Sequence, residues 1–216
     1  GTIARSGAAP SPANHFTTLP RKGLREAAAK AIVPFLSDLD PEIRVQALRS
    51  IGDAVISGDS LPLGGLLSDD SLRVRFAAGI AIGKMKAMGH YSAVISFLRR
   101  NNNRDVFLRH AGVYALEHMV TNPRQISILA KDRSPAVRLA AAVALRRLDS
   151  IEVARFINDT DPKVQDEVIR AIQDRDMKNM RPLAAALLDS LAAREWTPFM
   201  LRRLIHNAYR VGTAEN

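Results

Sequence analysis

The sequence predicts an all-α fold in which about six helix pairs stack into one superhelix. Three observations support it: a motif that recurs about every 32 residues, an apolar stripe at helical spacing after each copy, and helix-start residues before it. A pair of this length cannot bury its apolar face alone, so neighbouring pairs must stack. The 216 residues of the chain fit one such array.

The first five copies of the motif place an acidic or amide residue just before a helix and a basic or polar residue six positions later. Ser37–Arg44 reads SDLDPEIR, and Ser68–Arg75 reads SDDSLRVR. Because a guanidinium pairs with both oxygens of a carboxylate, we expect each Arg to pair with an Asp of its own or the next repeat. An anion-binding stripe is the less favoured alternative. The predicted structural ladder consists of Asp38, Arg44, Asp69, Arg75, Asn103, Arg109, Asp132, Arg138, Asp159, Gln165 and Arg202.

The helix after each motif carries an apolar stripe with a spacing of four residues, which falls on one face of an α-helix. We expect this face to be buried. Its middle position is Ala or Gly in the first four copies, and a small residue there lets two helices approach closely. The six stripes are Ile43/Ala47/Ile51, Val74/Ala78/Ile82, Leu108/Gly112/Leu116, Val137/Ala141/Leu145, Val164/Val168/Ile172 and Leu201/Ile205/Tyr209.

The starts of these helices are marked as well. Asp, Asn or Ser precedes them and can accept hydrogen bonds from the free N–H groups of the first turn. Pro41, Pro135 and Pro162 fall in first turns, where the missing N–H has no partner to lose. Gly79-x-x-x-Gly83 lies inside an apolar helix, which indicates close helix packing rather than a phosphate-binding loop.

Shorter apolar segments supply the first helix of each pair, and the second and fourth of them are short. Residues 57–65 and 100–104 are predicted loops. We expect one repeat domain over residues 23–213, preceded by an extended linker rich in Pro, Ala and Ser over 1–22 and followed by a frayed end at 214–216. The first helices are predicted at Leu24–Leu36, Leu61–Leu67, Tyr91–Leu98, Gln125–Leu129, Ile151–Ile157 and Met180–Leu191.

The composition excludes several kinds of function. The absence of cysteine excludes disulfides, thiolate metal sites and cysteine nucleophiles. No run of 18 apolar residues is present, so we predict no membrane-spanning helix and no membrane partner. No metalloprotease, serine-hydrolase or phosphate-loop motif occurs, and we predict no catalytic, cofactor-binding or metal-binding residue and no cofactor in this chain.

The favoured function is a non-catalytic scaffold or protein-interaction module. Residues offset by two positions from the buried stripe share the exposed side of the second helices, and Tyr and Arg are enriched at protein interfaces. For these particular residues, a solvated face without a partner is the interpretation we favour over a partner-binding strip. The candidate partner surface consists of His110, Tyr114, Glu117, Arg146, Arg170, Gln173, Arg203 and His206.

The net charge of +9 supports a second hypothesis, in which a basic face binds the phosphates of nucleic acid. The basic residues are scattered along the sequence, and Trp196 is the only tryptophan, so we favour this hypothesis less. A small enzyme with a substrate groove is the third hypothesis, for which no cluster of ionisable groups stands out.

The pattern Asp-Pro-x-Val-Arg-x-x-Ala-x-x-x-Leu resembles HEAT repeats, in the short form found in the HEAT-like repeats of phycobilisome lyases. The resemblance covers residues 24–212 and recurs in register. The tetratricopeptide and ankyrin signatures, which mark two other helical repeat families, are absent.

Four stretches are similar to the HEAT segment of large secreted bacterial proteins from planctomycetes and their relatives: Phe107–Leu116, Ser134–Leu148, Arg155–Val164 and Leu201–Thr213. In those proteins a glucose/sorbosone-dehydrogenase-like β-propeller precedes the repeats, and a c-type haem domain often follows. The resemblance implies an internal segment of a periplasmic or secreted oxidoreductase, with the flanking domains as partners and an array that continues further. This chain contains no propeller sequence and no Cys-x-x-Cys-His, so no catalytic or haem-binding residue is carried over.

Overall fold

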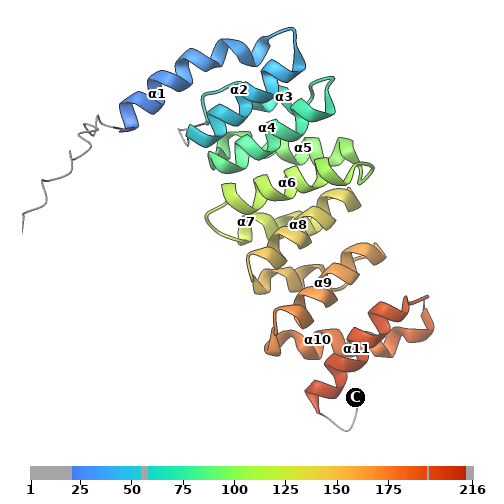
Figure 1. Cartoon of the computed structure of the whole chain (residues 1–216). Coiled ribbons are helices and arrows are strands. Elements are labelled where there is room, and N and C mark those ends of the chain that lie inside the picture. Colours follow the sequence, from blue (N-terminus) through green and yellow to red (C-terminus); the bar gives the residue numbers. More distant parts are fainter. Residues whose placement is uncertain (1–20, 55–57, 194, 213–216) are drawn as a thin grey trace, which may run out of the picture.

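The protein is a stack of helix pairs, shown in Figure 1 as a computed structural model that describes residues 21–54, 58–193 and 195–212. All regular structure in these ranges is helical, which confirms the predicted all-α repeat fold. The second helices of the pairs form one continuous layer along the stack. They are α2 (Pro41–Ala54), α4 (Leu72–Lys84), α6 (Val106–Met119), α8 (Pro135–Arg147), α9 (Pro162–Asp174) and α11 (Pro198–Val211).

The first helices are shorter and partly 3-10 in character. As predicted, the second of them is short, and the fourth is a short α-helix continued by a 3-10 turn. The fifth is shorter than expected and entirely 3-10. In chain order they are α1 (Arg21–Ile32) with η1 (Val33–Ser37), α3 (Leu63–Leu66), η2 (Met88–His90) with α5 (Tyr91–Asn101), α7 (Arg124–Ser127) with η3 (Ile128–Lys131), η4 (Ile151–Phe156), and η5 (Lys178–Met180) with α10 (Arg181–Ala185) and η6 (Ala186–Ala193).

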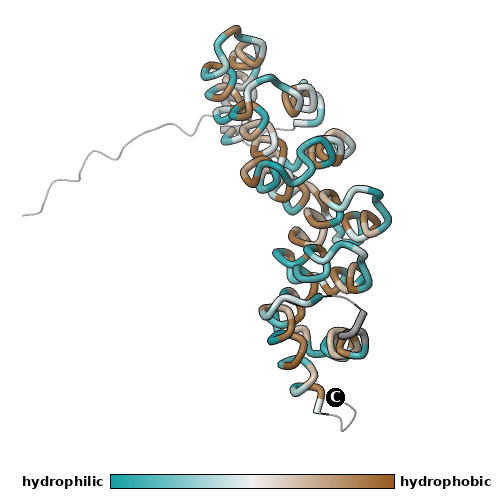
Figure 2. The backbone as a smooth tube through the Cα atoms, turned by 90° about the vertical axis from the view of Figure 1, so that its right-hand side faces the viewer, coloured by the Kyte–Doolittle hydropathy of each residue, from teal (hydrophilic) through white to brown (hydrophobic). Residues whose placement is uncertain are grey.

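The predicted buried stripe is confirmed in α4, α6, α8 and α9, where each of its members is buried. In α2 the first member, Ile43, is 41% exposed, and it belongs to the first helix pair of the described residues. Hydrophobic and hydrophilic residues alternate along the whole stack rather than forming one separate apolar block (Figure 2). The core is therefore a continuous seam between the two layers of helices.

The predicted stripe of the last helix is wrong by one residue. Ile205 and Tyr209 are 60% and 83% exposed, whereas Met200, Leu204 and Ala208 are buried. The reason is the position of the helix start: Thr197 caps α11 and accepts from the Met200 N–H at 3.2 Å. In α11 the cap, the Pro and one further residue therefore precede the first buried position, as they do in α9.

Glycines bring α4 and α6 into close contact. A Cβ atom at Gly79 would lie 2.9 Å from the Ala111 Cβ, and one at Gly83 would lie 2.6 Å from the Tyr114 ring. A Cβ at Gly112 would lie 2.5 Å from Leu98 of α5. The prediction that small residues permit close helix packing holds at these positions.

The domain boundary differs slightly from the prediction. Arg21 and Lys22, assigned to the linker from the sequence, belong to α1. The rest of the predicted linker and the predicted frayed end at 214–216 lie outside the described residues. Pro41, Pro135 and Pro162 are the first residues of their helices, as expected.

Candidate partner-binding surface

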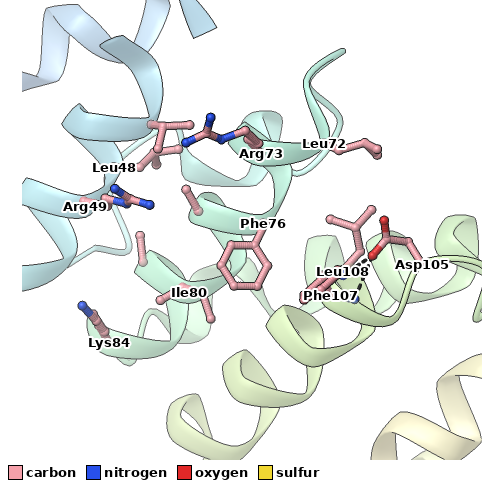
Figure 3. Close-up of a pocket in the computed structure, with 13 residues that line it drawn as sticks. Leu48, Arg49, Leu72, Arg73, Phe76, Ile80, Lys84, Asp105, Phe107 and Leu108 are labelled. Atoms are coloured by element: carbon pink, nitrogen blue, oxygen red, sulfur yellow. Dashed lines mark hydrogen bonds between the residues drawn. The ribbon is translucent and has the colours of Figure 1, made fainter. Parts of the chain in front are cut away.

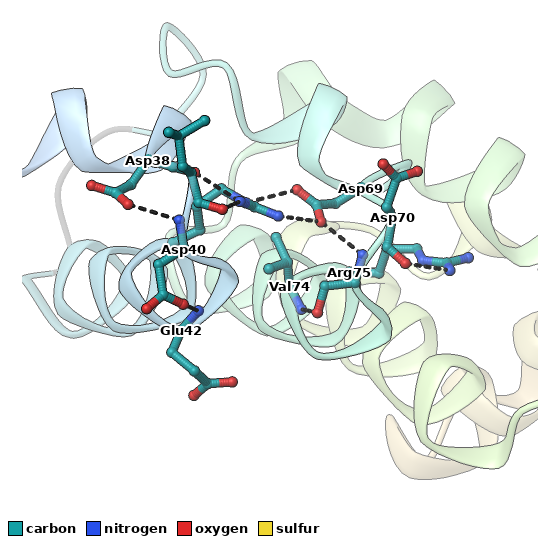
Figure 4. A network of polar contacts seen from close by, with 10 residues as sticks. Asp38, Asp40, Glu42, Asp69, Asp70, Val74 and Arg75 are labelled. Atoms are coloured by element: carbon teal, nitrogen blue, oxygen red, sulfur yellow. Dashed lines mark hydrogen bonds and ion pairs between the residues drawn. The ribbon is translucent and has the colours of Figure 1, made fainter.

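Two rungs of the predicted ladder join one repeat to the next. Arg44 Nε and Nη2 donate to Asp69 Oδ2 and Oδ1 at 3.0 and 2.9 Å. Arg138 makes the same two-pronged pair with Asp159, at 2.7 and 2.9 Å. The hydrogen bonds to these carboxylates raise the pKa of both arginines. Figure 4 shows the first of these rungs, with Asp69 facing the guanidinium of the preceding repeat.

The acidic members of the ladder also build their own turns. In four repeats the Asp Oδ1 accepts a hydrogen bond at 2.8 Å from the backbone N–H two residues later, which shapes the chain just before the second helix. The ladder is therefore structural in two senses, since it ties repeats together and sets the helix starts. The four bonds run from Asp40 to Asp38, Ser71 to Asp69, Ser134 to Asp132, and Asp161 to Asp159.

The rung between Arg75 and the third repeat is open. Asn103 adopts a left-handed conformation, with φ of 58°, and it makes no hydrogen bond to Arg75. Asn101 instead accepts the Asp105 N–H at 3.2 Å and donates to the Asp105 carbonyl at 2.9 Å. Arg75 keeps one long bond, 3.4 Å from Nη2 to the carbonyl of Asp70, and its buried Nε has no partner within the described chain (Figure 4).

The ladder positions at Arg109 and Gln165 also depart from the predicted pairing. Within the described ranges Arg109 has no carboxylate partner, and Asp132 pairs instead with Arg99 of α5 at 2.7 Å. Gln165 is buried, and its Nε2 donates to the carbonyl of Ile157 at 2.9 Å. An amide can donate to a neighbouring carbonyl but cannot form an ion pair. Gln165 therefore connects the two helices of its own repeat and does not link this repeat to the next one.

Because the register of α11 differs by one residue from the prediction, Arg202 and Arg203 do not occupy their predicted positions. The ladder position after Met200 is Leu201, so Arg202 is not a ladder residue. Arg203 lies over the ring of Phe199, 4.3 Å from its centroid, rather than in line with the other candidate surface residues. His206 is exposed on the outer side of the helix, where the shifted register keeps it on the predicted face.

The aromatic part of the candidate surface is assembled as one row. His110 stacks on Phe76 of the preceding repeat, with ring centroids 6.5 Å apart. Tyr114 stacks on His118 at 3.9 Å between centroids, and the His118 Nδ1 lies 2.9 Å from the Tyr114 carbonyl. The row runs along α6 and reaches α4, so it is continuous across two repeats.

The charged part of the candidate surface is largely occupied by ion pairs. Arg146, Arg147 and Arg170 are thereby held by carboxylates of this chain. Gln173 is half-buried, and its Oε1 has no hydrogen-bond partner among the described atoms. The pairs are Glu117 with Arg147 at 3.4 Å, Arg146 with Glu167, and Arg170 with Asp174 at 3.2 Å.

An apolar groove lies beside the aromatic row, between α2, α4 and α6. We call it the α4 groove, and its cavity volume is about 290 Å³. Leu72, Phe76 and Ile80, one turn apart on α4, form its floor, and Phe107 of α6 forms one wall (Figure 3). Leu72 is 51% exposed and Phe107 69% exposed. Exposed apolar side chains gathered in a concave site are typical of binding surfaces.

The rim of the α4 groove is basic. Arg49, Arg73 and Lys84 line it, and Asp105 is the acidic residue among its described lining residues. Arg73 pairs with Glu42 at 2.9 Å across exposed surface, and Lys84 pairs with Asp53. Arg49 is exposed and forms no ion pair with the described residues.

The α4 groove was not predicted from the sequence. A signal was present: Leu72, Phe76 and Ile80 form a second apolar stripe at helical spacing, offset by two residues from the buried one. The same offset places His110 and Tyr114 on the exposed face of the next helix, where they belong to the candidate partner surface rather than to an apolar stripe.

Compared with models of known protein families, the sequence matches none, and a comparison with curated proteins likewise finds no relative. No helix within the described ranges is long and apolar enough to cross a bilayer. Among the same residues, no three His, Asp or Glu side chains come together as a metal-binding group. The surface itself is therefore the basis for a functional proposal.

Proposed function

We propose that the protein is an interaction module that binds a peptide segment of a partner protein in the α4 groove. The observation that carries this proposal is the gathering of exposed apolar side chains from α4 and α6 over a cavity of about 290 Å³. Stacked helix pairs hold these side chains on a rigid layer, so little ordering is needed on binding.

The chemistry of the rim favours an acidic and apolar partner. Three basic residues face one acidic residue around the apolar floor. A segment with apolar side chains on one face and carboxylates beside them would match both properties. Phosphates of nucleic acid are a poorer match, because an apolar floor contributes nothing to binding a sugar–phosphate backbone, and Arg146 and Arg170, elsewhere on this layer, are already ion-paired.

A pair of designed peptides tests the proposal. Two fluorescently labelled amphipathic helices would share the same leucines and differ only in carrying Glu or Lys at the remaining positions. We expect the acidic peptide to bind and the basic peptide to bind at least about tenfold more weakly, measured by fluorescence anisotropy. Phe107→Ser should weaken binding of the acidic peptide about tenfold, because it removes a wall of the groove.

Phe199→Ser is the matched control. Phe199 is also the second residue of its helix and is 62% exposed, but it lies on α11, away from the groove. Equal losses in the two variants, or equal binding of both peptides, would contradict the proposal. Tight, salt-sensitive binding of duplex DNA that survives Phe107→Ser would favour the nucleic-acid hypothesis instead.

We also propose that this module belongs to a larger oxidoreductase and positions its flanking domains. The support is the resemblance of Phe107–Leu116 and Ser134–Leu148 to repeat segments of secreted dehydrogenase-like proteins. The test is a full-length parent protein from which residues 24–212 are deleted. We expect electron transfer between its domains to slow, and an unchanged rate would refute this placement.

A further inference from the structure

A second cavity adjoins the α4 groove and is lined by three arginines. Its volume is about 270 Å³, and Arg75, Arg100 and Arg104 line it. The two cavities share the lining residues Leu72, Asp105 and Leu108. We call the second cavity the arginine pocket. A ligand in the groove would thus have a cluster of guanidinium groups next to it.

The arginine pocket occupies the open rung of the ladder. Arg44 and Arg138 direct Nε and Nη2 at the two oxygens of an Asp from the next repeat. Arg75 holds the equivalent position, but its Nε is buried without a partner in the described chain. The residue that takes over the turn, Asn101, offers an uncharged amide. A buried donor without an acceptor is costly, so this pocket favours an acceptor from outside.

The surrounding charges favour an anion. Arg100 Nη2 donates to Ser68 Oγ at 2.8 Å and to the Leu67 carbonyl at 3.3 Å, which holds its guanidinium in place without neutralising it. Arg104 is exposed and forms no ion pair with any described residue. Asp105 is the one acidic residue in the lining, and its Oδ1 accepts the amide N–H groups of residues 107 and 108 at the start of α6.

We infer that the arginine pocket binds a carboxylate of the partner peptide, which completes the open rung while a neighbouring apolar side chain occupies the α4 groove. This inference rests on the proposed function and names the group that the partner must carry. A carboxylate is the matching anion, because Asp69 and Asp159 fill the same position in the two closed rungs. Guanidinium groups bind a planar carboxylate through two parallel hydrogen bonds.

Two small molecules separate the contribution of the carboxylate from that of the groove. N-acetyl-phenylalanine carries an aromatic ring beside a carboxylate, and N-acetyl-phenylalanine amide carries the same ring without the charge. We expect the acid to bind at least about tenfold more tightly than the amide in NMR titrations. The arginine Nε–H signal of Arg75 should move with the acid, because its free donor gains an acceptor.

Two variants and a matched control complete the experiment. Arg75→Met should remove the preference for the acid, whereas Arg109→Met should leave it unchanged, because Arg109 holds the next ladder position outside the pocket. Asn101→Asp places a carboxylate in the lining that also contains Arg75, at the cost of the bond that Asn101 donates to the Asp105 carbonyl. In this variant we expect the roughly tenfold higher affinity for the acid over the amide to disappear, while the protein remains folded.

The outcomes distinguish the two proposals. Equal affinity for the acid and the amide would overturn the inference. The proposal that a peptide binds in the α4 groove would still be tested separately, by the two designed peptides. Shifts at Arg75 caused by acetate alone, with no effect of the ring on affinity, would overturn the link between pocket and groove. Preference for the acid that survives Arg75→Met would place the carboxylate elsewhere and refute the assignment.

Discussion

Arg138 illustrates how much a single side chain of the ladder contributes. Its side chain and that of Asp159 are only 11% and 4% exposed, so water screens their pairing weakly. Arg138→Met keeps the apolar stem but leaves the Asp159 carboxylate buried without its guanidinium. We expect the free energy of unfolding to fall by about 2–4 kcal/mol, measured by urea denaturation.

Arg109→Met is the control for this prediction. It occupies the same ladder position in the preceding repeat, but within the described residues it pairs with no carboxylate. Its loss should stay below about 1 kcal/mol. If both variants lost the same stability, the ladder would act through the packing of its stems rather than through ion pairs.

Single residues were predictable where the chemistry was local. Charge and spacing predicted that each Arg pairs with an Asp of its own or the next repeat, and Arg44 and Arg138 pair with Asp69 and Asp159 of the next repeat. The open rung was not predictable, because it depends on whether the turn before α6 directs Asn101 or Asn103 toward Arg75. That choice is a backbone conformation, with both Asn102 and Asn103 left-handed.

At the scale of helices, Gly79 controls how closely α4 and α6 pack. A Cβ at this position meets the Ala111 Cβ at 2.9 Å and its carbonyl group at 3.4 Å, and neither can rotate away. Gly79→Ala gains about 1 kcal/mol of helix propensity but should lose more through crowding. We expect a net destabilisation of about 1–2 kcal/mol in thermal or urea unfolding.

Gly65→Ala provides the comparison. Gly65 is an exposed position in α3, and a Cβ there would have no atom within 4 Å. This variant should be neutral or stabilised by up to about 1 kcal/mol. A stabilised Gly79→Ala variant would mean that the two helices separate easily, which would contradict the packing described above.

The presence of each second helix was predictable because its apolar stripe repeats at four-residue spacing. The ends of the helices and the turns between them were harder to predict. Besides the turn at Asn102 and Asn103, three turns that follow second helices contain a left-handed residue that is not glycine: Lys86, Asp149 and Asp176. In the sequence these positions carry no glycine signal. The one-residue error in α11 arose from aligning basic residues, although the Thr-Pro start gave the correct register.

Over the whole molecule, the sequence predicted the stack but not the α4 groove. The α4 groove requires side chains from α2, α4 and α6 to face one cavity. Their mutual positions depend on the closeness of α4 to α6 and on the offset between repeats. Periodicity identifies which face of each helix is exposed, but it does not show which exposed faces meet.

The stack also predicts that stability differs along the chain. In a repeat array each pair is stabilised chiefly by its neighbours. Helix α6 packs against α4, α5 and α8, whereas α11 packs against α9, α10 and η6 and leaves Ile205 and Tyr209 exposed. We therefore expect α11 to open locally without the centre of the array, at a lower free energy than global unfolding.

Native-state hydrogen exchange measures this difference directly. Leu116 in α6 and Leu204 in α11 are both fully buried. A difference in exchange rate between their amides therefore reflects the packing of the two helices against their neighbours and not solvent exposure. We expect the Leu116 amide to exchange at least about 30-fold more slowly, which corresponds to about 2 kcal/mol. Equal protection would mean that the chain unfolds as one cooperative unit, because the core seam would then transmit stability from the central pairs to the last helix.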